Sequence, residues 1–206
     1  MKVELVASTE NAEIIIERAM RICHGGDVDP EKGANKTFIQ NIIKLGHESP
    51  LEHGVMTFKI MDVSRSLTHQ LVRHRIASYT QKSQRYCKED QFGYVILPEI
   101  EKNETFKTEF INMCKKINDL YTYLTLSGVK REDARYILPN ACFTDIWVTM
   151  NFRELRSFFK LRCDKHAQWE IRNLAKEMLR IAYSKYPIVF EDLYNVFLLN
   201  DFKVEV

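Results

Sequence analysis

Apolar residues recur every three or four positions along several stretches of the chain, a spacing typical of helices with one buried face. The stripe from Ile14 to Ile22 predicts a helix over 9–23, with Thr9 as its N-cap. The same reasoning predicts further helices over 36–45, 64–75, 103–127, 131–136, 152–184 and 192–199. The helix over 152–184 is either continuous or broken near Asp164.

Other stretches alternate between apolar and polar residues, the pattern of a half-buried strand. Met56, Phe58 and Ile60 alternate with polar neighbours, and further strands are predicted over 2–6, 94–97 and 142–150. Residues 76–87 are polar and aperiodic, so we predict a loop there. Long helices mixed with scattered strands, without regular βαβ units, indicate an α+β fold with mixed or antiparallel strands. We expect residues 1–206 to form a single domain.

Composition limits the class of protein. The 206 residues are 45% hydrophobic and 28% charged, with 7 glycines and 5 prolines, which excludes a disordered or collagen-like chain. The five cysteines include no CxxC pair, so we expect free thiols in a reducing compartment rather than a zinc finger. The N-terminus lacks an apolar signal region and no run of 18 apolar residues occurs. We therefore expect a cytoplasmic protein that makes no contact with a membrane.

The positive charge is concentrated in one segment. The net charge is +2, yet residues 63–88 contain no Asp or Glu and six basic residues, so the remainder carries −4. Such an island suggests a bound anion, and the alternative is a solvated basic face whose acidic partners come from elsewhere in the fold. A second alternative is a nucleic-acid-binding module centred on residues 63–88, in which Tyr79 and Tyr86 stack on bases.

The most informative segment runs from Gln70 to Tyr86. If the helix continues to Arg75, then Gln70, Arg73 and His74 share one of its faces. The polar stretch that follows offers Ser78, Thr80, Gln81, Ser83, Gln84 and Arg85. Arginine forks beside hydroxyl and amide groups suit a ligand that carries both a phosphate and an amide-edged ring. Cations that complement a helix dipole are the simpler explanation, but they account for one arginine only.

Arg73-His74-Arg75, then seven intervening residues and Ser83, resembles the signature of the flavin-dependent thymidylate synthase family. Three further segments resemble other motifs of this family in the same order. They are His47 to His53, Arg131 to Pro139, and Asn151-Phe152-Arg153 with Leu161-Arg162 and His166 to Glu170. The resemblance thus covers about residues 47–172.

The resemblance implies reductive methylation of dUMP to dTMP by an α+β homotetramer with active sites shared between subunits. Methylenetetrahydrofolate would supply the carbon, and FAD reduced by NADPH would supply the hydride. The matching flavin-contacting positions are Ser49, Glu52, Arg73, His74, Arg75, Gln81, Asn151, Arg153, Ser157 and Leu161. The matching dUMP-contacting positions are Gln70, Arg73, Gln81, Ser83, Gln84, Arg85, Arg135 and Arg162. Arg162 matches the catalytic arginine that activates the uracil.

The residues themselves refine this expectation. Arg162 is a permanent cation, which favours electrostatic activation of the ring over base catalysis. No cysteine lies within a matched motif, and Ser83 lacks a Ser-His-Asp arrangement, so we expect it to donate a hydrogen bond. Arg153 and Arg162 are nine residues apart and would project from opposite faces of an unbroken helix, which favours sites shared between subunits.

Some positions depart from the family pattern or stay open. The departures are Thr80, Gln81, Gln84 and Ser157, where the family often has Asn, Glu, Gly and Asn. His166 has either a ligand role or a packing role. The histidine pairs at 47 and 53 and at 69 and 74 lack metal-ligand spacing, so we predict no metal site.

Overall fold

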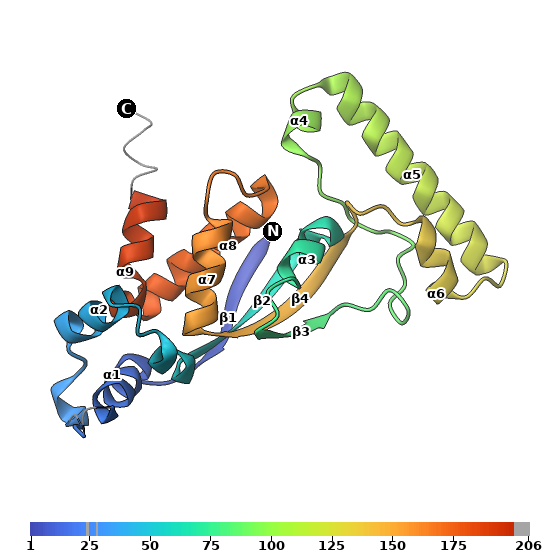
Figure 1. The fold of residues 1–206 in the computed structure, drawn as a ribbon. Coiled ribbons are helices and arrows are strands. Elements are labelled where there is room, and N and C mark those ends of the chain that lie inside the picture. Colours follow the sequence, from blue (N-terminus) through green and yellow to red (C-terminus); the bar gives the residue numbers. More distant parts are fainter. Residues whose placement is uncertain (24, 28, 200–206) are drawn as a thin grey trace. The chain divides into compact units, whose positions relative to one another are not determined.

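The computed structural model describes residues 1–23, 25–27 and 29–199, and these form a four-stranded sheet with helices (Figure 1). The strands are β1 Lys2–Ser8, β2 Val55–Ser64, β3 Ala77–Gln81 and β4 Phe143–Asn151. They form one antiparallel sheet in the order β1-β2-β4-β3. The fold is therefore α+β, as the sequence predicts.

The helices vary widely in length. They are α1 Ala12–Ile22, α2 Lys36–Lys44, α3 Arg65–Leu71, α4 Pro98–Glu101, α5 Glu104–Leu126, α6 Arg131–Ala134, α7 Phe152–Arg162, α8 Trp169–Lys185 and α9 Pro187–Tyr194. Four short turns of helix complete the secondary structure of the described residues: η1 Pro30–Lys32, η2 Ser49–His53, η3 Arg135–Ile137 and η4 Asn195–Leu199. None of the described helices is long and apolar enough to cross a membrane.

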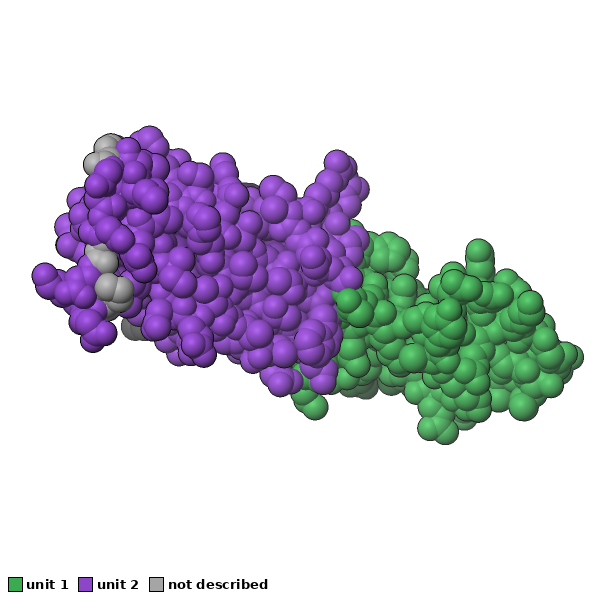
Figure 2. All heavy atoms as spheres, turned by 90° about the horizontal axis from the view of Figure 1, so that it is seen from below, with its two compact units in different colours: residues 1–2, 60–71, 80–146 green, residues 3–59, 72–79, 147–206 purple. Residues whose placement is uncertain are grey.

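The chain divides into two compact units, coloured separately in Figure 2. Unit 1 consists of residues 1–2, 60–71 and 80–146, and unit 2 of residues 3–59, 72–79 and 147–206. The chain passes from one unit to the other within β1, β2, β3 and β4 and directly after α3. The predicted site residues are therefore divided between the units.

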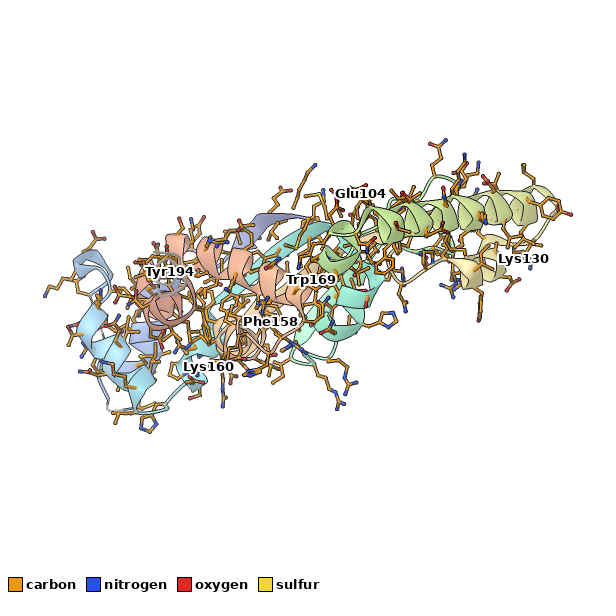
Figure 3. All side chains as sticks on the ribbon, turned by 90° about the horizontal axis from the view of Figure 1, so that it is seen from above. Glu104, Lys130, Phe158, Lys160, Trp169 and Tyr194 are labelled. Atoms are coloured by element: carbon orange, nitrogen blue, oxygen red, sulfur yellow. The ribbon has the colours of Figure 1, made fainter. Side chains whose placement is uncertain are left out.

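Aromatic rings fill the core of unit 2. The Phe152 ring lies 4.8 Å from that of Tyr186 and 5.2 Å from that of Phe190, and Phe159 lies 5.8 Å from Phe190. Phe158 is also fully buried on α7, whereas Lys160 lies on an exposed face of the same helix (Figure 3). These contacts fix α7 against α8 and α9 by burying apolar area, so α7 is a firm support for the side chains on its other faces.

Unit 1 has a smaller core beneath α5. Phe92, Cys114 and Cys142 are buried together, with Tyr94 and Phe110 packed against them. The long α5 helix begins at the N-cap Asn103, whose side chain accepts hydrogen bonds from two backbone N–H groups, and it ends before Gly128. Gly128 adopts a φ of 94°, which glycine tolerates without strain. The predicted helix over 103–127 is thus confirmed.

Three predictions about local structure are wrong. The first helix has Asn11 rather than Thr9 at its N-cap position, without a side-chain capping hydrogen bond, while the Thr9 hydroxyl accepts a hydrogen bond from the backbone N–H of Val55. Residues 77–81 form the edge strand β3 rather than a loop; an edge strand can be short and polar because one side faces no neighbour. The expected strand over 94–97 is only an isolated bridge from Tyr94 to Cys142.

The helix predicted over 64–75 starts as expected but ends early. The Ser64 hydroxyl accepts a hydrogen bond from the backbone N–H of Leu67, so its capping role is confirmed. The helix α3 stops at Leu71, however, and Arg73, His74 and Arg75 lie beyond it. The prediction that Gln70, Arg73 and His74 share a helix face is therefore wrong. The His74 ring makes hydrogen bonds within unit 2, and these contacts replace the last helical turn.

We expect the replacement of Gly54 by alanine to destabilise the protein by about 1–3 kcal/mol through overpacking. A Cβ atom at Gly54 would lie 2.7 Å from a carbon of the buried Phe152 ring, which is fixed by Tyr186 and Phe190. Thermal unfolding measures the change. Gly26→Ala is the matched control, since its Cβ would meet Arg21 at an ordinary 3.6 Å. Equal melting temperatures for both variants would contradict the expectation.

Candidate active site

The predicted site residues form two sets, one in each unit. Unit 2 contains Ser49, Glu52, Arg73, His74, Arg75, Asn151, Arg153, Ser157, Leu161 and Arg162. Unit 1 contains Gln70, Gln81, Ser83, Gln84, Arg85 and Arg135. The structure brings together several members within each set.

His74 is the centre of the set in unit 2. Its ring is buried, lies edge-on to Phe158 with centroids 4.9 Å apart, and has a hydrogen-bond partner on each nitrogen. Arg162 Nε donates to His74 Nε2 at 3.1 Å, and the carboxylate of Glu154 lies 3.1 Å from His74 Nδ1. The Tyr79 hydroxyl donates to the His74 carbonyl oxygen at 2.8 Å.

These contacts assign the protonation state of His74. An arginine Nε–H can only donate, so His74 Nε2 must carry a lone pair and the ring proton must sit on Nδ1, directed at Glu154. His74 is therefore neutral. A lowered pKa of His74 is consistent with a neutral ring. Burial has the largest effect and lowers the pKa, the charge of Arg162 lowers it further, and Glu154 acts in the opposite direction.

We expect this histidine to make stability depend on pH. Because its pKa in the folded protein lies below the ordinary value of 6.5, the unfolded chain binds the proton first. The free energy of unfolding should therefore fall as the pH drops below about 6.5, by at most about 1.4 kcal/mol per pH unit for one proton. Melting temperatures between about pH 8 and pH 5 measure this slope. A His74→Gln variant should show a shallower slope, and identical slopes would contradict the assignment.

The helix α7 positions the remaining residues of this set. Asn151, at its N-cap, accepts a hydrogen bond from the backbone N–H of Glu154 at 2.8 Å. Arg153 pairs with Glu52 at 2.6 Å, so these two predicted flavin-contacting residues meet each other. The helix α7 runs without a break from residue 152 to residue 162 and ends before Asp164. The helical region predicted over 152–184 is therefore interrupted near Asp164, the second of the two alternatives. Arg153 and Arg162 thus have different partners, Glu52 and His74.

Three arginines and one glutamate form the centre of the set in unit 1. Arg85 Nε donates to the Glu132 carboxylate at 3.1 Å, and Arg135 Nε donates to the Glu132 carbonyl oxygen at the same distance. Arg131 donates to the carbonyl oxygen of Tyr86 at 2.7 Å. Three positive charges against one negative charge leave this cluster with an excess suited to an anion.

Two glutamines of unit 1 direct their side chains at other side chains, whereas Ser83 contacts the backbone. Gln81 donates to the hydroxyls of Thr68 and Thr144 at 3.1 and 3.2 Å, and Gln84 is buried with its amide 3.8 Å from Cys142 Sγ. The extra bulk of Gln84, relative to the glycine common in the family, is thus accommodated inside unit 1. Ser83 accepts a hydrogen bond from the backbone N–H of Arg85.

The charge island has acidic partners from outside its own segment. Lys82 pairs with Glu89, Arg85 with Glu132, and Lys88 with Asp90. This is the arrangement expected for a basic face neutralised within the fold, and it removes much of the charge that a nucleic-acid-binding module would need. Arg73 and Arg75 remain as exposed cations of the island.

Two functional candidates were missed from the sequence. Glu154 stands three residues after the N-cap Asn151, where a glutamate is ordinarily explained by a capping box. The sequence therefore provided no reason to expect its contact with His74. Arg131 was predicted to begin a short helix and to lie in the Arg131–Pro139 motif, but it was not named as a ligand-contacting residue, although a third arginine near Arg135 was a visible signal.

His166 and the cysteines show no sign of a metal site or a nucleophile among the described residues. His166 is 82% exposed and contacts Asp164, which does not fit a packing role within this chain. Within the described part of the chain, no three His, Cys, Asp or Glu side chains are grouped to hold a metal ion. The five cysteines are free, and Cys114, Cys142 and Cys163 are buried. Burial raises the pKa of Cys142 to about 11, so its thiol is not activated as a nucleophile.

The fold and these two sets of side chains define an α+β protein equipped with arginines to bind anionic ligands. The family model described as thymidylate synthase complementing protein (Thy1) matches residues 4–188, and the chain belongs to this family. A flavin-dependent thymidylate synthase of Clostridium tetani is 44% identical over 93% of this chain and 86% of its own length. One of Geobacter sulfurreducens shows the same identity and coverage, and one of Pyrococcus furiosus is 48% identical over 68% of this chain and 59% of its own. The resemblance inferred from the motifs is confirmed.

Proposed function

We propose that this protein is a flavin-dependent thymidylate synthase that methylates dUMP reductively to dTMP. Methylenetetrahydrofolate serves as the carbon donor, and FAD reduced by NADPH serves as the hydride carrier. Family membership and the names of the relatives support the activity. The observation that carries the proposal is the hydrogen bond that places Arg162, the residue matching the family's activating arginine, on buried His74.

The residues of unit 2 fit the chemistry of FAD. Arg73 and Arg75 are exposed cations on either side of buried His74, and two guanidinium forks suit an anionic diphosphate. Ser49, Ser157 and Leu161 are exposed as well, on η2 and α7. Bound FAD would carry the hydride that reduces the transferred carbon to a methyl group.

The residues of unit 1 fit the nucleotide. Arg85 and Arg135 supply positive charge for the dUMP phosphate, and Glu132 holds Arg85 in place beside them. The Ser83 hydroxyl is available to donate, because its contact with the Arg85 backbone uses only its acceptor capacity. Gln70, Gln81 and Gln84 complete the part of the dUMP set that lies in unit 1, the last two through backbone groups since their amides contact other side chains.

Arg162 acts on the uracil ring by its charge. Burial lowers the pKa of its guanidinium and the charge of Arg73 lowers it further, yet arginine keeps its proton in proteins. A fixed cation beside the ring stabilises negative charge that develops when C5 becomes nucleophilic. No cysteine nucleophile takes part, in keeping with the raised pKa values of Cys114 and Cys142, each caused first by burial.

The assembly belongs to the proposal as well. Arg153 and Arg162 project from opposite faces of the unbroken α7, which supports a homotetramer with active sites shared between subunits. A stable monomer with full activity would contradict this arrangement. The free cysteines support a cytoplasmic location.

The first experiment is a visible absorption spectrum after incubation with FAD and gel filtration, followed by conversion of dUMP with methylenetetrahydrofolate and NADPH. A flavin band that elutes with an oligomer, and dTMP that forms only with all components present, would support the proposal. A colourless protein without dUMP turnover would overturn it. Omitting FAD from the assay serves as the control.

A further inference from the structure

Glu154 is the charged residue in contact with His74 that no family motif in the sequence assigns. It lies on the first turn of α7, with a side chain only 12% exposed, and its carboxylate lies 3.1 Å from His74 Nδ1. The Asn151 side chain accepts a hydrogen bond from the backbone N–H of Glu154, whereas the Glu154 carboxylate accepts from His74. A partly buried carboxylate needs a hydrogen-bond donor, and His74 supplies one.

The three side chains form a linear series from carboxylate to imidazole to guanidinium. Glu154 accepts from Nδ1–H of His74, and Nε2 of His74 accepts from Nε–H of Arg162. Each contact requires the other: only the tautomer with the proton on Nδ1 offers a lone pair to Arg162. The edge-on contact with Phe158 holds the ring in the plane that both bonds need.

We propose that Glu154 is a positioning residue, which fixes the tautomer of His74 so that His74 orients the guanidinium of Arg162. The arrangement resembles in its logic the carboxylates that orient ligating histidines at metal sites, where loss of the outer partner costs about 10–100-fold. The consequence for turnover rests on the proposed function, since it requires Arg162 to act on the uracil. The consequence for the tautomer does not.

Protein labelled with ¹⁵N-histidine tests the tautomer directly in the FAD-loaded chain. The signals of His74 are those that disappear in His74→Gln. We expect a protonated Nδ1 and an unprotonated Nε2 near neutral pH, and a shift away from this state in Glu154→Ala. Glu154→Gln should retain it, because an amide oxygen still accepts from Nδ1–H. A protonated Nε2 in the unmodified protein, or an unchanged tautomer in Glu154→Ala, would overturn the proposal.

Turnover of dUMP tests the consequence. We expect Glu154→Ala to lower kcat roughly 10-fold to 100-fold with a smaller change in KM for dUMP, and Glu154→Gln to retain most of kcat. The matched control is Glu177→Gln, which removes a carboxylate from an exposed pair with Arg180 on α8 and should leave kcat unchanged. Equal kcat for Glu154→Ala and the unmodified protein would overturn the positioning role.

The acid limb of the pH–rate profile gives a readout that a purely structural role would not move. Among the described residues, the titratable and charged groups at His74 are Glu154, Arg162 and Tyr79, with Arg73 and Arg75 adjacent in sequence. Protonation of His74 removes the lone pair that Arg162 uses. Because the Glu154 charge favours the protonated ring, Glu154→Gln should move the acid limb to lower pH, and a shift to higher pH would overturn the proposal. If the unmodified protein has no turnover at all, the proposed function fails while the ¹⁵N measurement still decides the role of Glu154.

Discussion

Replacing Arg162 with alanine should lower the turnover of dUMP by about 100-fold to 1000-fold while most of the FAD stays bound. The reason is that Arg162 offers a fixed positive charge held by His74, whereas the exposed Arg73, Arg75 and Arg153, which we propose as flavin-binding residues, remain in place. The measurement combines dTMP formation with the flavin absorbance retained after gel filtration.

The control for this variant is Arg180→Ala, which removes an arginine from an exposed pair with Glu177. It should change neither turnover nor flavin content. Arg162→Lys keeps a charge but loses the Nε–H that donates to His74, so we expect it to recover only part of the activity. If Arg162→Ala loses its flavin completely, Arg162 belongs to the cofactor scaffold and not to activation of the ring.

Replacing Asp192 with alanine should lower the free energy of unfolding by about 1.5–3 kcal/mol, because the buried cation Arg156 loses its paired carboxylate, although the Asp192 side chain itself is 53% exposed. Its carboxylate makes two hydrogen bonds to Arg156, at 2.8 and 2.6 Å, and Arg156 is only 1% exposed. Arg156 also donates to the carbonyl oxygen of Val189 and lies 3.8 Å from Glu48. Among the described residues, Arg156 then keeps only Val189 and Glu48 as partners, and the loss should lower the melting temperature by roughly 5 °C.

An exposed ion pair of the same unit provides the comparison. Glu177→Ala breaks the pair with Arg180, whose side chains are about half exposed, and should cost at most about 1 kcal/mol. An Asp192→Ala variant as stable as Glu177→Ala would show that water or Glu48 compensates the charge of Arg156.

The free energy of unfolding at acid pH should also depend on Asp192. Burial alone would raise the pKa of its carboxyl, but the hydrogen bond and charge of Arg156 outweigh this and lower it. A lowered pKa contributes stability above the ordinary value near 3.8, and the contribution is lost as the pH falls further.

The sequence by itself determined those helices and strands in which the spacing of apolar residues shows which face is buried. The alternation of Met56, Phe58 and Ile60 located β2, and all three residues are fully buried. The apolar spacing within 103–127 located α5 with nearly its observed ends. Motif spacing identified the family, because residue types and their intervals are properties of the chain alone, and the same spacing made Arg162 the candidate for the activating arginine.

The tertiary structure decided what depends on partners distant in sequence. Glu154 and Arg162 lie 80 and 88 residues from His74 along the chain, and no local sequence pattern predicts contacts at such separations. Their hydrogen bonds end α3 at Leu71, where local spacing favoured a helix to Arg75. Likewise β3 is a strand because its backbone pairs within the sheet, although its side chains have no strand pattern. A buried hydrogen-bonding group must find a partner wherever the fold places one, and that requirement outweighs a few residues of local preference.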